Sequence, residues 1–380
     1  MNKKLLAVAV AGALVAPTAF AQSSVTISGF FKGGLENMKY NQGAKANNGQ
    51  TGIADDSSRL IFNVVEDLGG GLQAIGQIDV RFKIDDIQNG GTAGVASSGG
   101  ASSSIGSGNT HVGLRSKDWG RIFIGRQDLH YFNTESNITD KGSLRTTPFS
   151  LLSFVGAGAN AGAIAGATRT QNVIHYTTPN WGGFTMIAAY SSNATNTEAD
   201  INSGIRKGRA WNLNPNMAGS NWQVGYSYWN SKQDNGGATT ATGDQRSDRL
   251  YGSYSWGGFK LGFAWDKSKV TAVNTGVKLN DRTAWSIPLS YTWGNHSINA
   301  HYTKARDDKA TALDDSAKMW AVGYAYDLSK RTSAALTYAK ITNAANGTYN
   351  FFTATSLGVG AAVAAGEDPR IWALTLRHAF

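Results

Sequence analysis

The sequence contains no cysteine and little charge, and both shortages exclude whole classes of protein. The missing thiols exclude a disulfide framework and a thiolate metal site. Charged side chains make up 16% of the chain, against about 25% in a typical soluble domain, so much of the surface is expected to face something other than bulk water. No run of about 18 apolar residues follows residue 21, which argues against a transmembrane helix. The mean hydropathy of −0.28 is also too polar for a bundle of membrane helices.

The amino terminus has the three parts of a secretory signal. Lys3 and Lys4 form a basic start, Leu5–Ala16 is an apolar stretch too short to span a bilayer, and Ala19-Phe20-Ala21 fits a cleavage site. We therefore expect residues 1–21 to be a bacterial signal peptide and residues 22–380 to be the mature protein. Without the two lysines, the mature chain keeps 33 basic and 26 acidic residues.

The remaining composition favours a membrane β-barrel. The chain has 46 Gly, 11 Trp, 14 Tyr and 15 Phe. Apolar and polar residues alternate in segments of about ten residues, as barrel strands do; between Leu72 and Lys83, one face is apolar and the other carries Gln, Asp, Arg and Lys. Sixteen strands are predicted: 24–39, 57–67, 71–84, 109–117, 120–127, 170–179, 183–192, 206–218, 220–232, 247–257, 258–270, 281–293, 295–306, 317–328, 331–343 and 369–380.

Short and long connections alternate between these strands. Turns such as Asp118-Trp119-Gly120 are short, whereas 85–108, 128–169, 233–246 and 344–368 are long. Outer-membrane barrels have short periplasmic turns and long external loops. The fold class expected is therefore all-β, a 16-stranded antiparallel transmembrane barrel, which is large enough to leave an aqueous channel.

Several short motifs, in their order along the chain, resemble the general trimeric porins of Gram-negative bacteria, in particular the β-proteobacterial branch. The motifs are Ser58-Arg59-Leu60, Glu66-Asp67-Leu68-Gly69-Gly70-Gly71-Leu72, Gly125-Arg126, Arg169, Asn172-Val173-Ile174-His175-Tyr176, Thr178-Pro179-Asn180-Trp181-Gly182-Gly183-Phe184, Leu328-Ser329-Lys330-Arg331-Thr332 and Arg377-His378-Ala379-Phe380. The resemblance implies a homotrimer in the outer membrane that passes small hydrophilic solutes by diffusion.

Strand alternation predicts an excess of cations on the inner wall. The inward cations expected are Lys32, Arg59, Arg81, Lys83, Arg115, Arg249, Lys260, Arg282 and Arg377. The inward acids expected are Glu36, Asp79 and Asp266. Charged rings on a channel wall select ions, so we expect anion preference. The alternative is that these are wetted residues whose charge is balanced by acids on the loops.

The resemblance also implies where the channel narrows. In such porins the third external loop folds into the barrel and faces a ladder of basic residues. Here that loop is expected at about 128–169, with the acids Asp128, Glu135 and Asp140. Relatives can carry arginine where this chain has Asn109-Thr110-His111, which implies a shorter ladder and a milder preference.

Five arginines are the candidates for that ladder. Arg59 and Arg169 lie in matching motifs and are the strongest candidates. Arg126 also lies in one, but the alternation breaks near it and leaves its direction open. Arg81 and Arg115 follow from the alternation alone.

Three other functions are weighed. A substrate-specific channel, for phosphate or organic acids, would share the architecture; a structural or adhesive barrel would not conduct; a barrel enzyme would need a nucleophile beside His, and no such motif is found. The scattered histidines predict no metal site, and no cofactor or nucleic-acid partner is expected. The partners expected are two further copies, outer-membrane lipid and lipopolysaccharide, and the outer-membrane assembly machinery.

Overall fold

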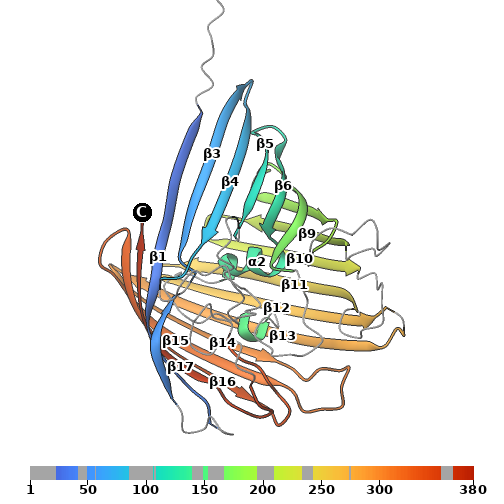
Figure 1. Ribbon diagram of the computed structural model, residues 1–380, viewed down its shortest axis with the longest axis vertical. Helices are drawn as coiled ribbons and strands as arrows, with labels where there is room; N and C mark the ends of the chain where they lie inside the picture. The colour runs from blue at the N-terminus through green and yellow to red at the C-terminus, as the bar shows by residue number, and fades with distance from the viewer. Residues whose placement is uncertain are drawn as a thin grey trace, which may run out of the picture.

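Within the residues that the computed structural model describes, seventeen strand segments join into one antiparallel sheet that closes on itself (Figure 1). The described residues are 23–41, 49–55, 57–84, 106, 108–138, 149–152, 167–194, 209–232, 243–273, 275–351 and 363–380. The strands are β1 (Ser24–Lys39), β2 (Gln50–Asp55), β3 (Arg59–Gly69), β4 (Leu72–Arg81), β5 (Thr110–Ser116), β6 (Gly120–Asp128), β7 (Arg169–Thr177), β8 (Phe184–Ser191), β9 (Arg209–Ala218), β10 (Trp222–Lys232), β11 (Gly243–Trp256), β12 (Phe259–Ala272), β13 (Lys278–Trp293), β14 (His296–Ala305), β15 (Ala317–Asp327), β16 (Thr332–Asn343) and β17 (Arg370–Ala379).

The barrel closes because β1 pairs with β17 on one side and with both β2 and β3 on the other. One part of β1 pairs with β3 and the next part pairs with β2, so β2 and β3 are two parts of a single wall position. The seventeen segments thus make a closed barrel of sixteen wall positions. Closure leaves no unpaired sheet edge, which a lipid environment requires.

Strand alternation decides which side chains face in and which face out. In β15, Trp320 and Val322 are exposed on the outer face while Met319 and Ala321 are buried on the inner face. The outer side chains cannot bury themselves within one copy of the chain, and their apolar character matches a hydrocarbon environment. The short side chains of the inner face leave space inside the barrel.

All sixteen predicted strands are confirmed, with ends that differ by a few residues. The segment β2 was not predicted as a separate strand. Pro215, in the weakest predicted strand, pairs with Met186 of β8, while the ladder to β10 is interrupted beside it. Pro288 likewise pairs with His301 of β14 and interrupts only the ladder to β12. Each proline lacks an N–H and disturbs one neighbouring strand.

Two aromatic girdles surround the outer wall. Near the short turns, rings stack along a row that includes Trp256, Phe259 and Tyr291. Near the long connections, Tyr338 lies between Trp320 and Trp372, with ring centroids 5.0 and 4.5 Å away. Tyr and Trp prefer the boundary between hydrocarbon and headgroups, so the two girdles mark the two membrane surfaces.

The described residues include two helices, α2 (His130–Ile138) and α3 (Phe149–Leu152), both in the connection between β6 and β7. The sequence did not predict them. No helix in the described ranges is both long and apolar enough to cross a membrane. The predicted signal peptide, residues 1–21, lies outside the described residues.

Candidate functional site

Four arginines and two aspartates gather on the inner wall formed by β3, β4, β6 and β7; we call Arg59, Arg81, Arg126, Arg169, Asp79 and Asp128 the basic cluster. Arg59 and Arg81 are direct partners across β3 and β4. Both reach Asp79 Oδ2, at 3.6 Å from Arg59 Nη1 and 3.4 Å from Arg81 Nη2. One buried carboxylate is therefore shared between two guanidinium groups.

Arg169 joins the cluster from the first position of β7. It is paired with Asp128 across β6 and β7, and it interacts electrostatically with Arg59, Arg81 and Arg126. Its guanidinium carbon also lies 5.3 Å from the ring centroid of Phe132 on α2. The basic cluster thus carries a surplus of two positive charges. Through Phe132, Arg169 also links the cluster to the segment between β6 and β7.

A β-bulge explains how Arg126 reaches this group. The ladder between β6 and β7 shifts register between Gly125 and Gln127, and a bulge changes the direction of the side chains around it. Gly125 has φ +145°, and a Cβ there would overlap the carbonyl oxygen of Thr110. Arg126 consequently interacts with Arg81 and Asp128. Its side chain is therefore directed toward the basic cluster, a direction that strand alternation could not predict.

Replacing Gly125 by alanine is therefore expected to lower the free energy of unfolding by about 2 kcal/mol or more, because both the dihedral angle and the added carbon are unfavourable. The matched control is Gly76→Ala on β4, where an added Cβ would meet only ordinary contacts at 3.8 Å. Urea unfolding of both variants in detergent micelles tests this. Equal stabilities for the two variants would contradict the strain at Gly125.

Asn109 holds both carboxylates of the basic cluster in place. Its side-chain amide donates to Asp128 Oδ2 at 3.0 Å, and its backbone N–H donates to Asp79 Oδ2 at 3.4 Å. Asp128 N–H donates back to Asn109 Oδ1 at 2.8 Å. The sequence drew attention to Asn109 only for the arginine it lacks; its role as a support for two acids required the structure.

The structure separates Arg115 from the other four candidate arginines. Arg126 is paired with Thr110 at one end of β5, whereas Arg115 lies five residues away at the turn end, a separation of about 17 Å along the strand. Arg115 donates to Gln73 Oε1 at 2.7 and 3.0 Å. Its partner across β5 and β6 is Arg121, which forms a second basic position nearer the short turns.

The three candidate acids of the 128–169 connection have different outcomes. Asp128 belongs to the end of β6 and lies within the basic cluster, so it does not face the cluster from across the barrel. The side chain of Glu135 and the whole of Asp140 lie outside the described residues.

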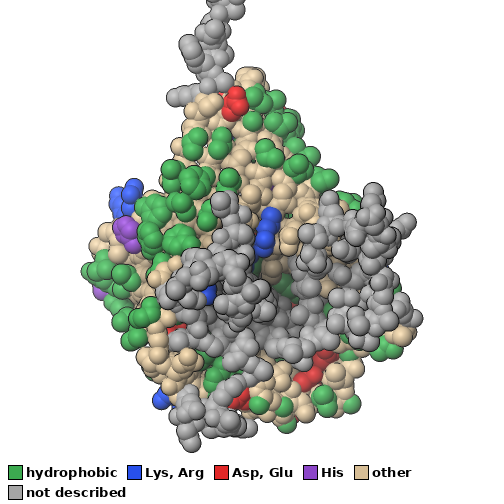
Figure 2. Space-filling view, viewed as in Figure 1, with side chains coloured by type: hydrophobic (Ala, Val, Ile, Leu, Met, Phe, Trp, Pro, Cys, Tyr) green, Lys and Arg blue, Asp and Glu red, His purple; other side chains and the backbone are tan. Residues whose placement is uncertain are grey.

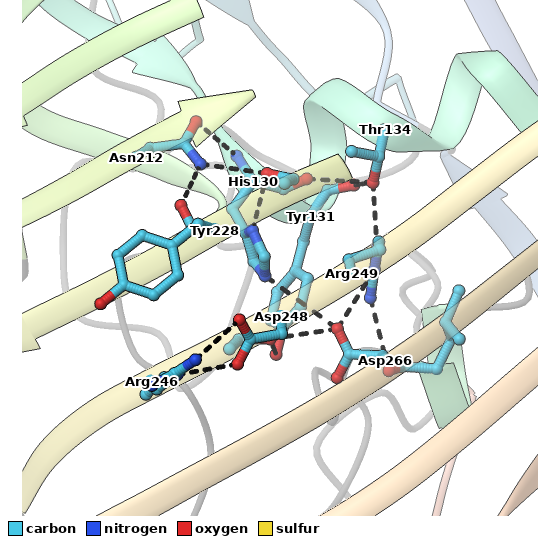
Figure 3. A network of polar contacts seen from close by, with 12 residues as sticks. His130, Tyr131, Thr134, Asn212, Tyr228, Arg246, Asp248, Arg249 and Asp266 are labelled. Carbon is cyan, nitrogen blue, oxygen red and sulfur yellow. Dashed lines mark hydrogen bonds and ion pairs between the residues drawn. The ribbon is translucent and has the colours of Figure 1, made fainter. Parts of the chain in front are cut away.

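The helix α2 lies inside the barrel against β10, β11 and β12 (Figure 3). Arg249 Nη1 donates to Thr134 Oγ1 at 3.1 Å, and Arg249 Nε donates to Asp266 Oδ2 at 3.2 Å. The guanidinium carbon lies 4.4 Å from the ring centroid of Tyr131. Arg249 therefore binds the helix and the wall at once. We call Arg249, Asp266, His130, Tyr131, Thr134, Ser227, Ser247 and Asn212 the anchoring network.

The rest of the anchoring network is equally buried. Tyr131 Oη donates to Ser247 Oγ at 3.3 Å, and Ser247 Oγ donates to Asp266 Oδ2 at 3.1 Å. His130 Nδ1 lies 2.8 Å from Ser227 Oγ. Burial, together with the nearby charge of Arg249, lowers the pKa of His130 well below its ordinary value. The imidazole is therefore neutral, and Arg249 and Asp266 are the charges of the network.

The helix α3 is anchored farther around the wall by the carbonyl group of Leu152 and by its two leucine side chains. Leu152 O accepts from Arg282 Nη2 at 3.2 Å and from Arg249 Nη2 at 3.4 Å. Arg282 Nη1 donates to Tyr349 Oη at 2.9 Å. Leu151 and Leu152 are fully buried in a cluster with inward-facing small residues. These small residues are Ala284, Ala305, Ala317, Ala321 and Ala339.

The two helices are anchored mainly on the wall opposite the basic cluster. Helix α2 starts beside the cluster, where it contacts β6 and places Phe132 against Arg169. Its other contacts and those of α3 are with β10 to β15, whereas the cluster lies on β3 to β7. In the closed order of sixteen positions, these walls face each other across the interior. Basic side chains are visible at the central hollow of the molecule (Figure 2). A solute crossing the barrel would pass between a positively charged wall and the anchored connection.

Comparison with known proteins gives one family and several relatives. The family model described as Gram-negative porin matches residues 6–346. A protein named outer membrane porin protein 32 of Delftia acidovorans is 29% identical over the full length of both chains, and an outer membrane porin protein of Bordetella pertussis is 29% identical over 88% of this chain and 92% of its own. Among solved structures, the anion-selective porin from Comamonas acidovorans has a TM-score of 0.74 at 22% identity, covering 94% of this chain and 100% of that one.

Proposed function

This chain belongs to the Gram-negative porin family and is an outer-membrane porin, and we propose that its channel passes small hydrophilic solutes passively with a preference for anions. The observation that carries the proposal is the basic cluster, with four arginines against two aspartates, on the wall opposite the strands to which α2 and α3 are mainly anchored. The relative from Comamonas acidovorans is described as anion-selective, which supports the same sign of preference here. Porins are channels, and we propose no catalytic activity.

The mechanism needs only electrostatics and a narrow path. Fixed charges that line a cleft with low-dielectric walls raise the local concentration of the opposite ion. Arg59, Arg81 and Arg169 are held by shared carboxylates and by strand pairing, so they need no rearrangement when an anion arrives. Conduction also requires that an ion leave easily, and Asp79 and Asp128 weaken the attraction enough for that.

We propose that the functional unit is a homotrimer whose copies meet through the outer wall of β1 to β6. These six strands contain no Trp and no Tyr, whereas the girdles described above run along the wall from β8 to β17. Their outer face is mostly aliphatic, with Val25, Ile27, Val112 and Ile124 exposed, and its exposed ring is that of Phe31, which contacts Phe82 and Phe380. Trp119 is exposed in the turn between β5 and β6, but the strands themselves lack the Trp and Tyr rows of the girdles, and such a wall fits contact with another copy better than contact with the membrane boundary.

The remaining partners are proposed from the chain ends and the outer surface. We propose that residues 1–21 direct export and are removed. The terminal strand ends in Phe380, whose backbone exchanges hydrogen bonds with Gly29, and we propose that this aromatic end is read by the outer-membrane assembly machinery. Lipid and lipopolysaccharide are the proposed surroundings of the barrel.

A substrate-specific channel for phosphate or organic acids is the second candidate. The cross-strand pair Arg115 and Arg121 favours it, because the side-chain acceptors of both arginines are neutral groups, Gln73 and Thr177. A guanidinium pair of this kind matches an oxyanion. Such a channel would show a current that saturates with phosphate.

The test of the main proposal is the reversal potential of the refolded mature protein in a planar bilayer across a KCl gradient. We expect a potential of the sign set by chloride, with current rising linearly with salt. A potassium sign would show that the basic cluster does not govern selectivity, and insertion without current would reject the channel. A current that saturates with phosphate but not with chloride would favour the substrate-specific channel.

A further inference from the structure

A second basic site lies on the inner wall near the short turns. Arg115 and Arg121, which we call the arginine pair, are direct partners across β5 and β6. Their neighbours Leu114 and Ile122 are exposed on the outer face, so the alternation of a strand directs both arginines inward. The pair belongs to a row of successive partners across β3 to β7, namely Asp67, Gln73, Arg115, Arg121 and Thr177.

Neutral groups hold the arginine pair. Arg115 donates to Gln73 Oε1 through Nη2 and Nε, at 2.7 and 3.0 Å, and Arg121 Nε donates to Thr177 Oγ1 at 3.3 Å. Among the residues that the structure describes, neither arginine forms an ion pair. Asp67, the acid of the row, is separated from Arg115 by Gln73 and accepts from the backbone N–H of Gly69 at 2.9 Å. The pair therefore keeps both of its positive charges.

The two charges are arranged at a cost to the sheet. Directly opposed like charges destabilise neighbouring strands, and Arg115 acts electrostatically on Arg121. The basic cluster reduces the same repulsion with carboxylates, because Asp79 lies within 3.6 Å of two guanidinium groups. The arginine pair contains no such carboxylate, so an anion bound between its two guanidinium groups would relieve the repulsion.

Both arginines have N–H groups left to bind that anion. Arg121 Nη1 and Nη2 and Arg115 Nη1 have no acceptor within the described ranges, and Arg115 is exposed. Guanidinium groups bind the oxygens of phosphate and carboxylate through parallel N–H donors. A divalent oxyanion would match both the two charges and the free donors, whereas one chloride would neutralise only one arginine.

Stacked rings support Arg121. Phe123 is buried between His111 and His175, with ring centroids 4.2 and 4.3 Å away. The guanidinium carbon of Arg121 lies 5.5 Å from the centroid of Phe123, and a cation is attracted to an aromatic face. Because the neighbouring rings hold Phe123, Arg121 is fixed before an anion arrives, which lowers the entropic cost of binding.

We propose that the arginine pair is a binding site for divalent oxyanions of the phosphate type, and that it retains them at the periplasmic end of the channel. This rests on the proposed channel function. Arg115 and Arg121 flank the short turn between β5 and β6, and short turns of outer-membrane barrels are periplasmic. A dianion interacts with each fixed charge twice as strongly as chloride does. An anion that moves inward therefore passes the basic cluster first and meets the arginine pair before it leaves.

Block of the chloride current by phosphate tests the proposal. The refolded mature protein conducts KCl in a planar bilayer, and potassium phosphate is added at a slightly alkaline pH, at which phosphate is mainly divalent. We expect Arg115→Gln and Arg121→Gln each to need about tenfold more phosphate for half-block, because each loses a charged hydrogen-bond donor. The matched control is Lys260→Gln, which removes one inward cation beside a short turn of the far wall. It should be blocked like the unchanged protein.

Two further anions identify the ligand class. Sulfate, a divalent oxyanion, should block the unchanged protein as phosphate does, and acetate, a monovalent one, should not block at the same concentration. Block by acetate as strong as block by phosphate would overturn the proposal. So would an equal response of all variants to phosphate, or the same loss of block in Lys260→Gln as in the two arginine variants. Each variant must first insert and conduct KCl, which shows that it is folded. A steady chloride current without block by phosphate rejects only this site, whereas insertion without current rejects the channel itself.

Discussion

Replacing Arg249 by methionine is expected to lower the free energy of unfolding by about 3–5 kcal/mol and to make the single-channel current fluctuate. The change leaves Asp266 buried and without its guanidinium partner, and an unpaired buried charge costs this much. It also removes the donor to Thr134 Oγ1 and the cation over the Tyr131 ring. Helix α2 would then lose its main attachment to β11 and move within the channel.

The control for this prediction lies three residues away on the same strand. Arg246 also pairs with an aspartate, Asp248, at 2.8 Å, but on the exposed outer face and without contact to α2. Arg246→Met should cost less than about 1 kcal/mol, as exposed ion pairs do, and leave the current steady. A third variant, Thr134→Val, keeps Arg249 with Asp266 and removes only the helix side of the contact. It should produce the current fluctuations with a smaller loss of stability; steady currents in both Arg249→Met and Thr134→Val would contradict the anchoring role.

The sequence was sufficient to predict the strands of the barrel, but not the helices α2 and α3 that lie inside it. The alternation of apolar and polar residues is a local pattern that can be read without knowing the rest of the fold. It was therefore enough to identify all sixteen predicted strands. It also placed Arg249, Arg282 and Asp266 correctly on the inner face. What alternation cannot indicate is whether an inward residue meets water or another part of the chain. These three residues lie beneath α2 and α3 and are fully buried, so they anchor the connection and do not face the open path.

The same limit explains the outcomes for the five candidate arginines. Arg59 and Arg81 follow from alternation because no irregularity separates them from the strand centre. Arg126 depends on the bulge at Gly125, which a period of two residues cannot represent. Arg115 follows the same alternation but lies at a different height from the other four arginines, because alternation carries no information on depth along the barrel axis. The small residues of β15 and β16 show a further case: they face inward and make room for Leu151 and Leu152, which alternation alone does not indicate.

Replacing both Arg59 and Arg169 by glutamine is expected to remove most of the anion preference. A unit charge about 8 Å from a passing ion contributes about 0.5 kcal/mol even at the dielectric constant of water, and more beside a low-dielectric wall. The contribution has opposite signs for chloride and potassium, so each lost charge changes the permeability ratio roughly fivefold. The double change should therefore lower the ratio of chloride to potassium permeability by on the order of tenfold or more. The measurement is the reversal potential across a KCl gradient, which should move toward zero or beyond it.

The opposite substitution in the same cluster supplies the decisive contrast. Asp79→Asn keeps the four arginines and removes one negative charge, so the reversal potential should move further in the chloride direction. Arg331→Gln, at an exposed short turn, should leave it unchanged. The three variants differ in where the charge lies as well as in its sign, and only control by the basic cluster predicts this order. If Arg331→Gln shifts the potential as much as Arg59→Gln/Arg169→Gln does, then net charge sets the preference and the position of the cluster does not. If Asp79→Asn moves the potential toward zero, Asp79 acts mainly by holding Arg59 and Arg81 in place, and its negative charge has little direct effect on the passing ion.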